Sequence, residues 1–445
     1  MPWVPLGLLV LSCLYFLYRG PYRAWDGFDG RDLSVFYTAS RAWLDGASPY
    51  DPQTLRGVSV GTAVGLEAVP SLNPPTTFAL LAPLAVLPWP DAERVALAVN
   101  FALVVACLVM VMSLADLRLR EPRGLLFAAF VIALAPFHTA IALGQLTIAA
   151  TALIVAALWG TEHDHPVLSG LCIALAVAMK PQMGLVFLLL FLLRRQWTAL
   201  FSAITVLGGI AAVAVVRLAI AGVDWLPTLA SNLSRSGVND PAVPTAYLRV
   251  NLQGLASHIL PGLSATAIDA LVYGFGAAAL ALLFAALRHR VDREATLLLY
   301  AACSIATLVM FYNRIYSATL LILPVAWAFA PFRPRRLRAV ALLVAGAAAV
   351  FVVPGAAALA HLPFPDGLRW VAHTSWWPYL LLHQSVALLV ILAGLLVAAT
   401  YRGVDYPREG EAVAVAPHFA TRGSLSYHIP ASPPSRKSAT IGRTN

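Results

Sequence analysis

Long stretches of apolar residues, separated by short polar segments, recur along the chain up to about residue 400. A helix that crosses the hydrocarbon core of a bilayer needs about 20 apolar residues. Five runs have this length, and their pattern predicts membrane-spanning helices. They are Arg94–Leu114, Thr198–Ile220, Leu263–Leu287, Arg338–Ala360 and Pro378–Thr400.

Other apolar runs are shorter and come as closely linked pairs. The pairs are Leu125–Leu143 with Gln145–Trp159, Val167–Met179 with Met183–Leu193, and Ala295–Phe311 with Ile315–Ala330. We expect several of these helices to stop inside the protein or to line a cavity, because irregular backbone at membrane depth needs protein or water around it. The run Trp3–Tyr18 lacks the basic start of a signal peptide and is interpreted as a retained first helix. The sequence therefore predicts an all-α integral membrane bundle of about twelve transmembrane helices.

Composition supports this class. The chain is 60% hydrophobic and 11% charged, too few charged residues to cover a soluble surface. The net charge of +9 does not indicate nucleic-acid binding, because the basic residues lie in short loops between apolar runs. Four arginine clusters fall on one side if the spans alternate from a cytoplasmic N-terminus, which places both termini in the cytoplasm. They are Arg118–Arg123, Arg194–Arg195, Arg288–Arg293 and Arg333–Arg338.

The segment Thr76–Pro88 is interpreted as a re-entrant or interface-lying helix, because a full span there would put the next arginine cluster outside. The chain divides into a membrane domain, residues 1–400, and a cytoplasmic tail, residues 401–445, rich in Pro, Ser, Arg and Gly and expected to be disordered. The four cysteines lie in apolar runs and show no zinc spacing. No motif indicates a metal site, a nucleotide site or another cofactor.

The first non-cytoplasmic loop, from Arg19 to about Arg94, is rich in Asp, Tyr and Trp. Apolar residues recur at helical spacing after Asp32, which predicts an amphipathic helix on the membrane surface. Asp32 could cap this helix. It could also serve as a general base at the mouth of a membrane cavity. Asp29, three residues earlier, could take either role or bind substrate.

Lys180, in the segment MKPQ, follows an apolar run on the same side as Asp32. Only two residues of the chain are lysines, Lys180 and Lys437. An ionisable residue at this depth is a candidate functional group. Lys180 could be an interfacial lysine whose ammonium reaches water. It could instead bind a phosphate group, for which a compact ammonium is well suited.

Further polar residues fall on the same face. Gln145, in LGQLT, lies between two short helices, and Asn251 lies in RVNLQG. The segment FYNRIY places Tyr312, Asn313 and Arg314 between two short spans. Arg314 needs an anionic partner in so apolar a region, either a carboxylate or a ligand phosphate. Gln145, Asn251, Tyr312 and Asn313 are predicted to bind substrate, and Arg314 to bind phosphate.

Several segments in this order resemble glycosyltransferase family 87. They are RDLSVFYTASRAWLDGASPY, NPPTTFALLAPLAVLP, LGQLT, SGLCIALAVAMKPQMGLVFLLLFLLRRQW, RVNLQGLASHIL and FYNRIY, which reach to about Ala330. The resemblance implies a GT-C membrane fold and a polyprenyl-phosphate sugar donor. It maps the proposed catalytic base onto Asp32 and the lysine of the Lys-Pro motif onto Lys180. Better-known relatives place a histidine near Tyr312, where this chain has none.

The resemblance thus implies a bacterial cytoplasmic-membrane enzyme that acts on the extracytoplasmic face. It would move mannose or another hexose from a polyprenyl phosphate to an envelope glycolipid or glycan, with inversion. Asp32 would take the proton of the acceptor hydroxyl, and Lys180 and Arg314 would stabilise the departing phosphate. No metal is required, because fixed cations can hold the phosphate.

Two other readings of the sequence stay open. A transporter or flippase of lipid-linked sugars also has broken helices and intramembrane polar residues. Against it, the polar residues gather on one face, and no repeat relates the two halves. A non-catalytic scaffold in envelope assembly is the third reading.

Overall fold

The computed structural model describes residues 3–25, 31–62, 71–236, 249–288, 290, 292–353 and 376–404, with residues 355, 359, 370 and 374. The chain separates into two compact units, Met1–Val404 and Asp405–Asn445. The predicted tail begins at residue 401, inside the first unit, because α21 continues to Val404. The second unit lies outside the described residues, so the disorder of the tail stays a prediction. Asp29 also lies outside them.

Within the described residues every regular element is a helix, which confirms the all-α prediction. Six helices are long and apolar enough to cross a membrane. They are α1 (Trp3–Leu17) with the π-helix η1 (Tyr18–Tyr22), α6 (Trp89–Ala115), α12 (Trp197–Ile220), α15 (Ala265–Leu287), α16 (Arg293–Met310) and α21 (His383–Val404). A bent pair raises the count to seven. The prediction of about twelve spans is therefore not confirmed.

The remaining helices are short, and several carry the predicted breaks. They are α2 (Arg23–Trp25), α3 (Arg31–Leu44), α4 (Pro52–Gly61), α5 (Pro75–Ala85), α7 (Pro122–Ala133), α8 (Ala135–Leu143), α9 (Thr147–Glu162), α10 (Pro166–Met179), α11 (Pro181–Leu193), α13 (Trp225–Arg235), α14 (Leu252–Ile259), η3 (Ile315–Leu321), α17 (Ile322–Phe329), η4 (Arg335–Leu337), α18 (Arg338–Ala349), η5 (Val350–Val352) and α20 (Trp377–Leu381).

The run Leu125–Leu143, expected as one helix, is two helices that meet at 44°. Leu134 between them has extended backbone, with ψ at 124°. Pro136 explains the break, because it has no N–H to donate to the carbonyl of Ile132, four residues earlier, and its ring clashes with that carbonyl. Each helix of this bent pair is too short to cross a bilayer alone.

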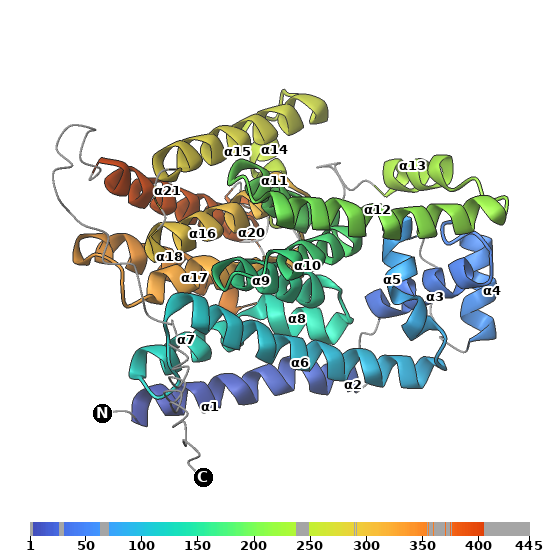
Figure 1. Ribbon diagram of the computed structural model, residues 1–445, viewed down its shortest axis with the longest axis horizontal. Coiled ribbons are helices and arrows are strands. Elements are labelled where there is room, and N and C mark those ends of the chain that lie inside the picture. The colour runs from blue at the N-terminus through green and yellow to red at the C-terminus, as the bar shows by residue number, and fades with distance from the viewer. Residues whose placement is uncertain are drawn as a thin grey trace, which may run out of the picture. The chain divides into compact units, whose positions relative to one another are not determined.

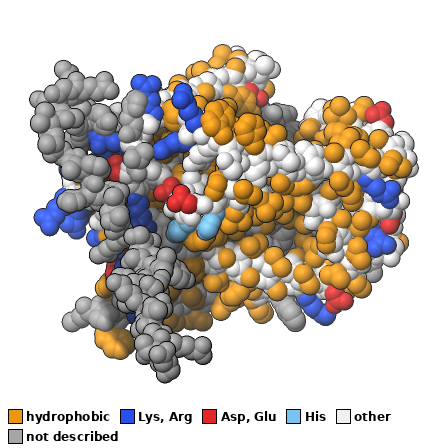
Figure 2. Space-filling model, viewed as in Figure 1, with side chains coloured by type: hydrophobic (Ala, Val, Ile, Leu, Met, Phe, Trp, Pro, Cys, Tyr) orange, Lys and Arg blue, Asp and Glu red, His pale blue; other side chains and the backbone are white. Residues whose placement is uncertain are grey.

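Helix α16 forms the centre of the helical core. All residues from Glu294 to Val309 are buried. The helix packs against α11, α15, α17 and α21, and α15 and α21 also pack against each other. Figure 2 shows hydrophobic side chains over much of the middle of the visible face, with basic side chains towards its left and right. An apolar outer surface over a buried helix is expected for a bundle that has lipid as its solvent.

Helices α3, α4, α5 and α13 gather around one end of α6 and α12 (Figure 1). Trp43 of α3 donates a hydrogen bond from Nε1 to the carbonyl oxygen of Ala214 in α12, at 3.1 Å. Tyr50 is fully buried, and its hydroxyl donates to the carbonyl of Asn73 at 2.8 Å. Most of α3 is buried between its neighbours. The predicted helix after Asp32 is confirmed, whereas its place on a membrane surface stays a prediction.

Candidate functional site

A tight turn between α8 and α9 places Gln145. Gly144 ends α8 in the left-handed conformation, with φ at +64°, and the Gln145 N–H bonds back to the carbonyl of Ala140 at 2.8 Å. This closure is typical of a glycine helix end. A Cβ on Gly144 would lie 2.5 Å from the Cβ of Leu33. Glycine therefore lets the start of α3 pack directly on the turn.

Asp32 lies in the first turn of α3, which begins one residue earlier at Arg31. Because Leu33 sits on Gly144, the neighbouring Asp32 meets the neighbouring Gln145. The Gln145 Nε2 donates a hydrogen bond to Oδ2 of Asp32. This hydrogen bond joins Asp32 to a residue 113 positions later in the sequence.

Lys180 occupies the break between α10 and α11, and Pro181 directly after it begins α11. Two threonines of α5 fix the end of α10. The Thr76 hydroxyl donates to the carbonyl of Ala178 at 2.7 Å, and the Thr77 hydroxyl donates to the carbonyl of Met179 at 3.1 Å. These bonds satisfy carbonyls that a helix end leaves without partners. The segment NPPTT thus positions Lys180.

The Lys180 ammonium contacts the same glutamine as Asp32. Its Nζ donates to Oε1 of Gln145 at 3.0 Å and lies 5.3 Å from the ring centre of Tyr316. Only 6% of Lys180 is exposed. Burial lowers the pKa of Lys180 to about 8, and the Asp32 carboxylate opposes that shift. The site thus aligns a carboxylate, an amide and an ammonium.

Arg314 lies beside this line. Its Nε donates to the hydroxyl of Tyr312 at 2.9 Å, and its backbone pairs with Arg249 in an isolated β-bridge. Burial lowers the pKa of Arg314, but Tyr312, Tyr316 and Asp32 together outweigh burial and raise it above its usual value. Among the described residues no carboxylate lies within ion-pair distance of Arg314 or Lys180. Both cations therefore lie near Asp32 without being neutralised by a direct ion pair.

Asn313 and Asn251 are both buried. Asn313 directly precedes Arg314, and Asn251 lies two residues after Arg249, the bridge partner of Arg314. The Asn313 Nδ2 donates to the carbonyls of Thr307 and Phe311, both at 3.1 Å, and thereby closes the end of α16. The Oδ1 atoms of Asn313 and Asn251 have no hydrogen-bond partner within the described part of the chain. Buried acceptors without partners are rare in proteins. The Nδ2 group of Asn313 is therefore structural. The Oδ1 atoms of Asn313 and Asn251 can still accept hydrogen bonds from a ligand.

A cavity of about 220 Å³ lies next to the turn. Leu33, Gly144 and Ile141 line one side of it. The N-terminal half of α6 lines another side with Asn100 and with Glu93 and Arg94. The cavity thus combines apolar walls with a few polar groups, and two residues of its lining, Leu33 and Gly144, are the chain neighbours of Asp32 and Gln145.

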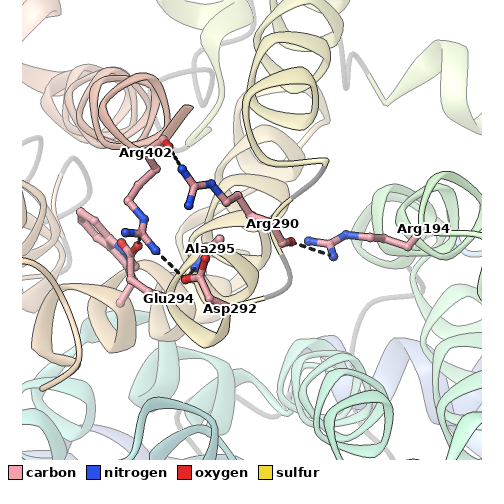
Figure 3. Close-up of polar contacts among 7 residues, drawn as sticks. Arg194, Arg290, Asp292, Glu294, Ala295 and Arg402 are labelled. Atoms are coloured by element: carbon pink, nitrogen blue, oxygen red, sulfur yellow. Dashed lines mark hydrogen bonds and ion pairs between the residues drawn. The ribbon is translucent and has the colours of Figure 1, made fainter. Parts of the chain in front are cut away.

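A second charged cluster occupies the other end of α16 (Figure 3). Arg402 of α21 forms an ion pair with Glu294, with Nε 2.6 Å from Oε2. Its Nη2 donates a hydrogen bond to Oδ1 of Asp292 at 2.7 Å. The indole N–H of Trp327 donates to Oε1 of Glu294 at 3.0 Å. Arg290 donates to the carbonyl of Arg402 at 2.7 Å, which ties α21 to the start of α16. Its charges satisfy one another, so this cluster is structural.

The structure thus brings together Asp32, Gln145, Lys180 and Arg314, with Tyr312, Asn313 and Asn251 close to Arg314. The roles predicted for these residues stay predictions, and Asp29 is outside the described residues. Within the described ranges no three His, Cys, Asp or Glu side chains meet as a metal-binding group. A carboxylate close to two fixed cations can accept a proton while the cations hold an anionic leaving group.

Four residues that contribute to the site were not among the predicted site residues. Tyr316 lies under the Lys180 ammonium, and Arg249 stands 5.8 Å from the ring centre of Tyr312. Thr76 and Thr77 hold the end of α10. Arg249 could have been noticed as a buried charge next to Asn251, whereas nothing local in NPPTT indicates a contact with α10.

Comparison with known proteins gives a consistent result. The family model described as glycosyltransferase family 87 matches residues 72–312, just over half of the chain. Gln145, Lys180, Asn251 and Tyr312 lie inside this range, whereas Asp32 precedes it and Arg314 follows it. No solved structure matches the chain significantly.

Two curated relatives carry the name polyprenol-phosphate-mannose-dependent alpha-(1-2)-phosphatidylinositol mannoside mannosyltransferase. The protein of Mycobacterium tuberculosis is 31% identical over 219 residues, which are 45% of this chain and 49% of the relative. The protein of Mycolicibacterium smegmatis is 31% identical over 191 residues, 40% of each chain. The matched part thus spans half or less of these relatives. The extent of the family match shows that the chain is a member of glycosyltransferase family 87.

Proposed function

We propose that this protein is a membrane glycosyltransferase that moves a sugar, mannose or another hexose, from a polyprenyl phosphate to the hydroxyl of a lipid or glycan acceptor. The family and the names of the relatives support the donor class and a lipid acceptor. The observation that carries the proposal is the line Asp32–Gln145–Lys180, in which one amide bonds both a carboxylate and an ammonium.

The reaction breaks the bond between C1 of the sugar and the phosphate oxygen and forms a bond from C1 to the acceptor oxygen. Asp32 takes the proton of the acceptor hydroxyl as its oxygen attacks C1. The electron pair of the broken bond leaves with the polyprenyl phosphate. Attack opposite the leaving group inverts the anomeric carbon.

Lys180 and Arg314 stabilise the departing phosphate. A leaving phosphate gains negative charge as the C1–O bond breaks, and cations fixed in a poorly solvated site stabilise that charge strongly. The Lys180 ammonium can move towards the phosphate, because the only described hydrogen bond of its Nζ is to neutral Gln145. We assign the partner-free oxygens of Asn251 and Asn313 to sugar hydroxyls, which would satisfy them.

We assign the cavity beside Leu33 and Gly144 to the acceptor. It adjoins the residues next to Asp32 and Gln145, and neither Lys180 nor Arg314 lines it. Asn100, Glu93 and Arg94 supply groups that bind hydroxyls from its α6 side. The acceptor hydroxyl and the donor phosphate would then lie on opposite sides of the sugar C1, as an in-line displacement requires. By the arginine distribution, this site faces the extracytoplasmic side.

The substitution Asp32→Asn tests the proposal. It keeps the size of the side chain and the contact with Gln145, but it removes the base. We expect transfer from polyprenyl-phosphate mannose to a membrane lipid acceptor to fall about 10²–10⁴-fold, measured with purified protein and radiolabelled donor.

Asp45→Asn is the matched control, because Asp45 follows the same helix and its carboxylate makes only an exposed ion pair with Arg41 among the described residues. It should keep full transfer. Full transfer by the Asp32→Asn protein would refute the role of Asp32. Sugar flux into proteoliposomes without any glycosidic product would refute the proposed activity.

A further inference from the structure

One face of helix α13 is fixed to the protein. Trp225 and Leu229 pack against the core cluster that contains Leu218 of α12. Asn232 donates a hydrogen bond from Nδ2 to the carbonyl oxygen of Tyr50 at 2.9 Å. Trp225, Leu229 and Asn232 recur at helical spacing and therefore lie on the same side of α13.

The two flanks of this face differ in chemistry. Leu226 and Leu233 lie on one flank at helical spacing, and 59% and 42% of their surfaces are exposed. Thr228, Ser231 and Arg235 lie on the other flank, where Arg235 is exposed and the two hydroxyl residues are partly exposed. A helix that is apolar on one exposed side and polar on the other suits a boundary between hydrocarbon and water.

The apolar flank follows a membrane-spanning helix. Helix α12 is one of the candidate spans, and its exposed apolar side chains continue to its end, with Val213 at 61%, Val216 at 53% and Ile220 at 78%. Only Ala221–Asp224 separate α12 from α13, and α13 lies next to this end of α12 (Figure 1). The same end packs on α3, which carries Asp32. Hydrocarbon that surrounds α12 therefore reaches α13 on the side of the candidate site.

We propose that α13 rests its leucine flank on the acyl chains of the lipid leaflet on the side of the candidate site. The partner of this surface is the bilayer itself, because the surface continues from a helix that has lipid as its solvent. The polar flank, with Arg235, then faces water and lipid headgroups. The proposal does not rest on the proposed function.

The lipid contact bears on the position of the candidate site. Asn232 of α13 holds the carbonyl of Tyr50, and the Tyr50 hydroxyl donates to the carbonyl of Asn73 at 2.8 Å. Asn73 lies just before α5, whose Thr76 holds the end of α10 directly before Lys180. The leaflet is therefore connected to Lys180 through segments that pack on one another.

The accessibility of spin labels in liposomes tests the proposal without turnover. Cys13→Ser removes the partly exposed cysteine, and the other cysteines are buried. In this background Leu226→Cys, Leu233→Cys and Arg235→Cys are labelled one at a time with a nitroxide. The full-length protein is reconstituted into phosphatidylcholine–phosphatidylglycerol liposomes. Collision of the label with oxygen, which concentrates in hydrocarbon, and with a water-soluble nickel chelate is measured by electron paramagnetic resonance.

We expect the ratio of oxygen to nickel-chelate collisions to be several-fold higher for Leu226→Cys and Leu233→Cys than for Arg235→Cys. Arg235→Cys is the matched control, because it is exposed on the same turn as Leu233 but on the polar flank. Val213→Cys on α12 gives the reference value for a label in hydrocarbon.

Three outcomes would overturn the proposal. If either leucine position preferred the nickel chelate as strongly as Arg235→Cys, the apolar flank would face water. If both leucine positions were shielded from both reagents, another protein surface would cover the flank. If Arg235→Cys matched Val213→Cys, α13 would lie wholly in hydrocarbon and not at its boundary.

Discussion

The two ends of α16 carry buried charge in opposite ways. At the Arg293 end, the Arg402 guanidinium forms ion pairs with Asp292 and Glu294. The indole N–H of Trp327 donates a hydrogen bond to Glu294. At the Met310 end, Lys180 and Arg314 lie near Asp32, but a neutral glutamine stands between the carboxylate and the lysine. Charges paired at the first end hold helices together. Charges left without direct ion pairs at the second end can bind a charged ligand.

The largest expected effect on stability comes from the paired end. Arg402→Met leaves Glu294, which is 4% exposed, without its cation. Breaking a buried ion pair by removing one partner costs about 3–5 kcal/mol. We expect a lower melting temperature of the detergent-solubilised protein and unchanged transfer per folded molecule. If the Arg402→Met protein had normal stability but lost transfer, the Arg293 end would be functional and not structural, which contradicts the assignment made here.

The largest expected effect on activity alone comes from the other end. Lys180→Met removes a cation that no described carboxylate pairs with, so it strands no opposite charge. The loss of one hydrogen bond to Gln145 costs about 1 kcal/mol. We expect the kcat/KM of transfer to fall about 10²–10³-fold, as for removal of one group that stabilises transition-state charge. A loss of stability as large as that of Arg402→Met would make Lys180 a structural residue.

A smaller effect is expected in the pH dependence of transfer, and it tests whether the charge of Lys180 is used. The pKa of Lys180 is lowered to about 8, so the ammonium is charged below this pH and loses its proton above it. The kcat/KM for the donor should therefore be highest below about pH 8 and fall as the pH rises further. Arginine keeps its charge throughout this range.

The variant Lys180→Arg should therefore lose the alkaline fall, even if its activity at neutral pH is lower because the guanidinium has another shape. A pH–rate profile of wild type and variant decides the point. An unchanged alkaline fall in the variant would attribute it to another group.

The sequence predicted the helical class and many helix boundaries because proline and apolar length act locally. Pro181 after Lys180 separates α10 from α11 as expected. The break at Leu134 was missed, although Pro136 is an equally local signal. The number of spans was not predictable in this way, since a short apolar helix such as α17 is buried by its neighbours and need not cross a membrane.

In the candidate site too, local signals were predictable and contacts between distant segments were not. Each charged residue could be noticed because it interrupts an apolar pattern, as Lys180 and Arg314 do. Their partners could not, because the contact of Asp32 with Gln145 depends on how α3 packs on a glycine turn far along the chain. The hold of Thr76 on α10 is another contact between distant segments.

The short helices on either side of Lys180 also bear on how the chain is made. Helices α10 and α11 have 14 and 13 residues, about 21 Å and 20 Å long, whereas the hydrocarbon core is about 30 Å thick. Each is shorter than the core is thick. We therefore expect the two helices to insert together as a hairpin with Lys180 at its tip, next to α9 and α12, which pack on α10. The residue on which the proposed chemistry depends would then also lie where insertion requires two helices to act together.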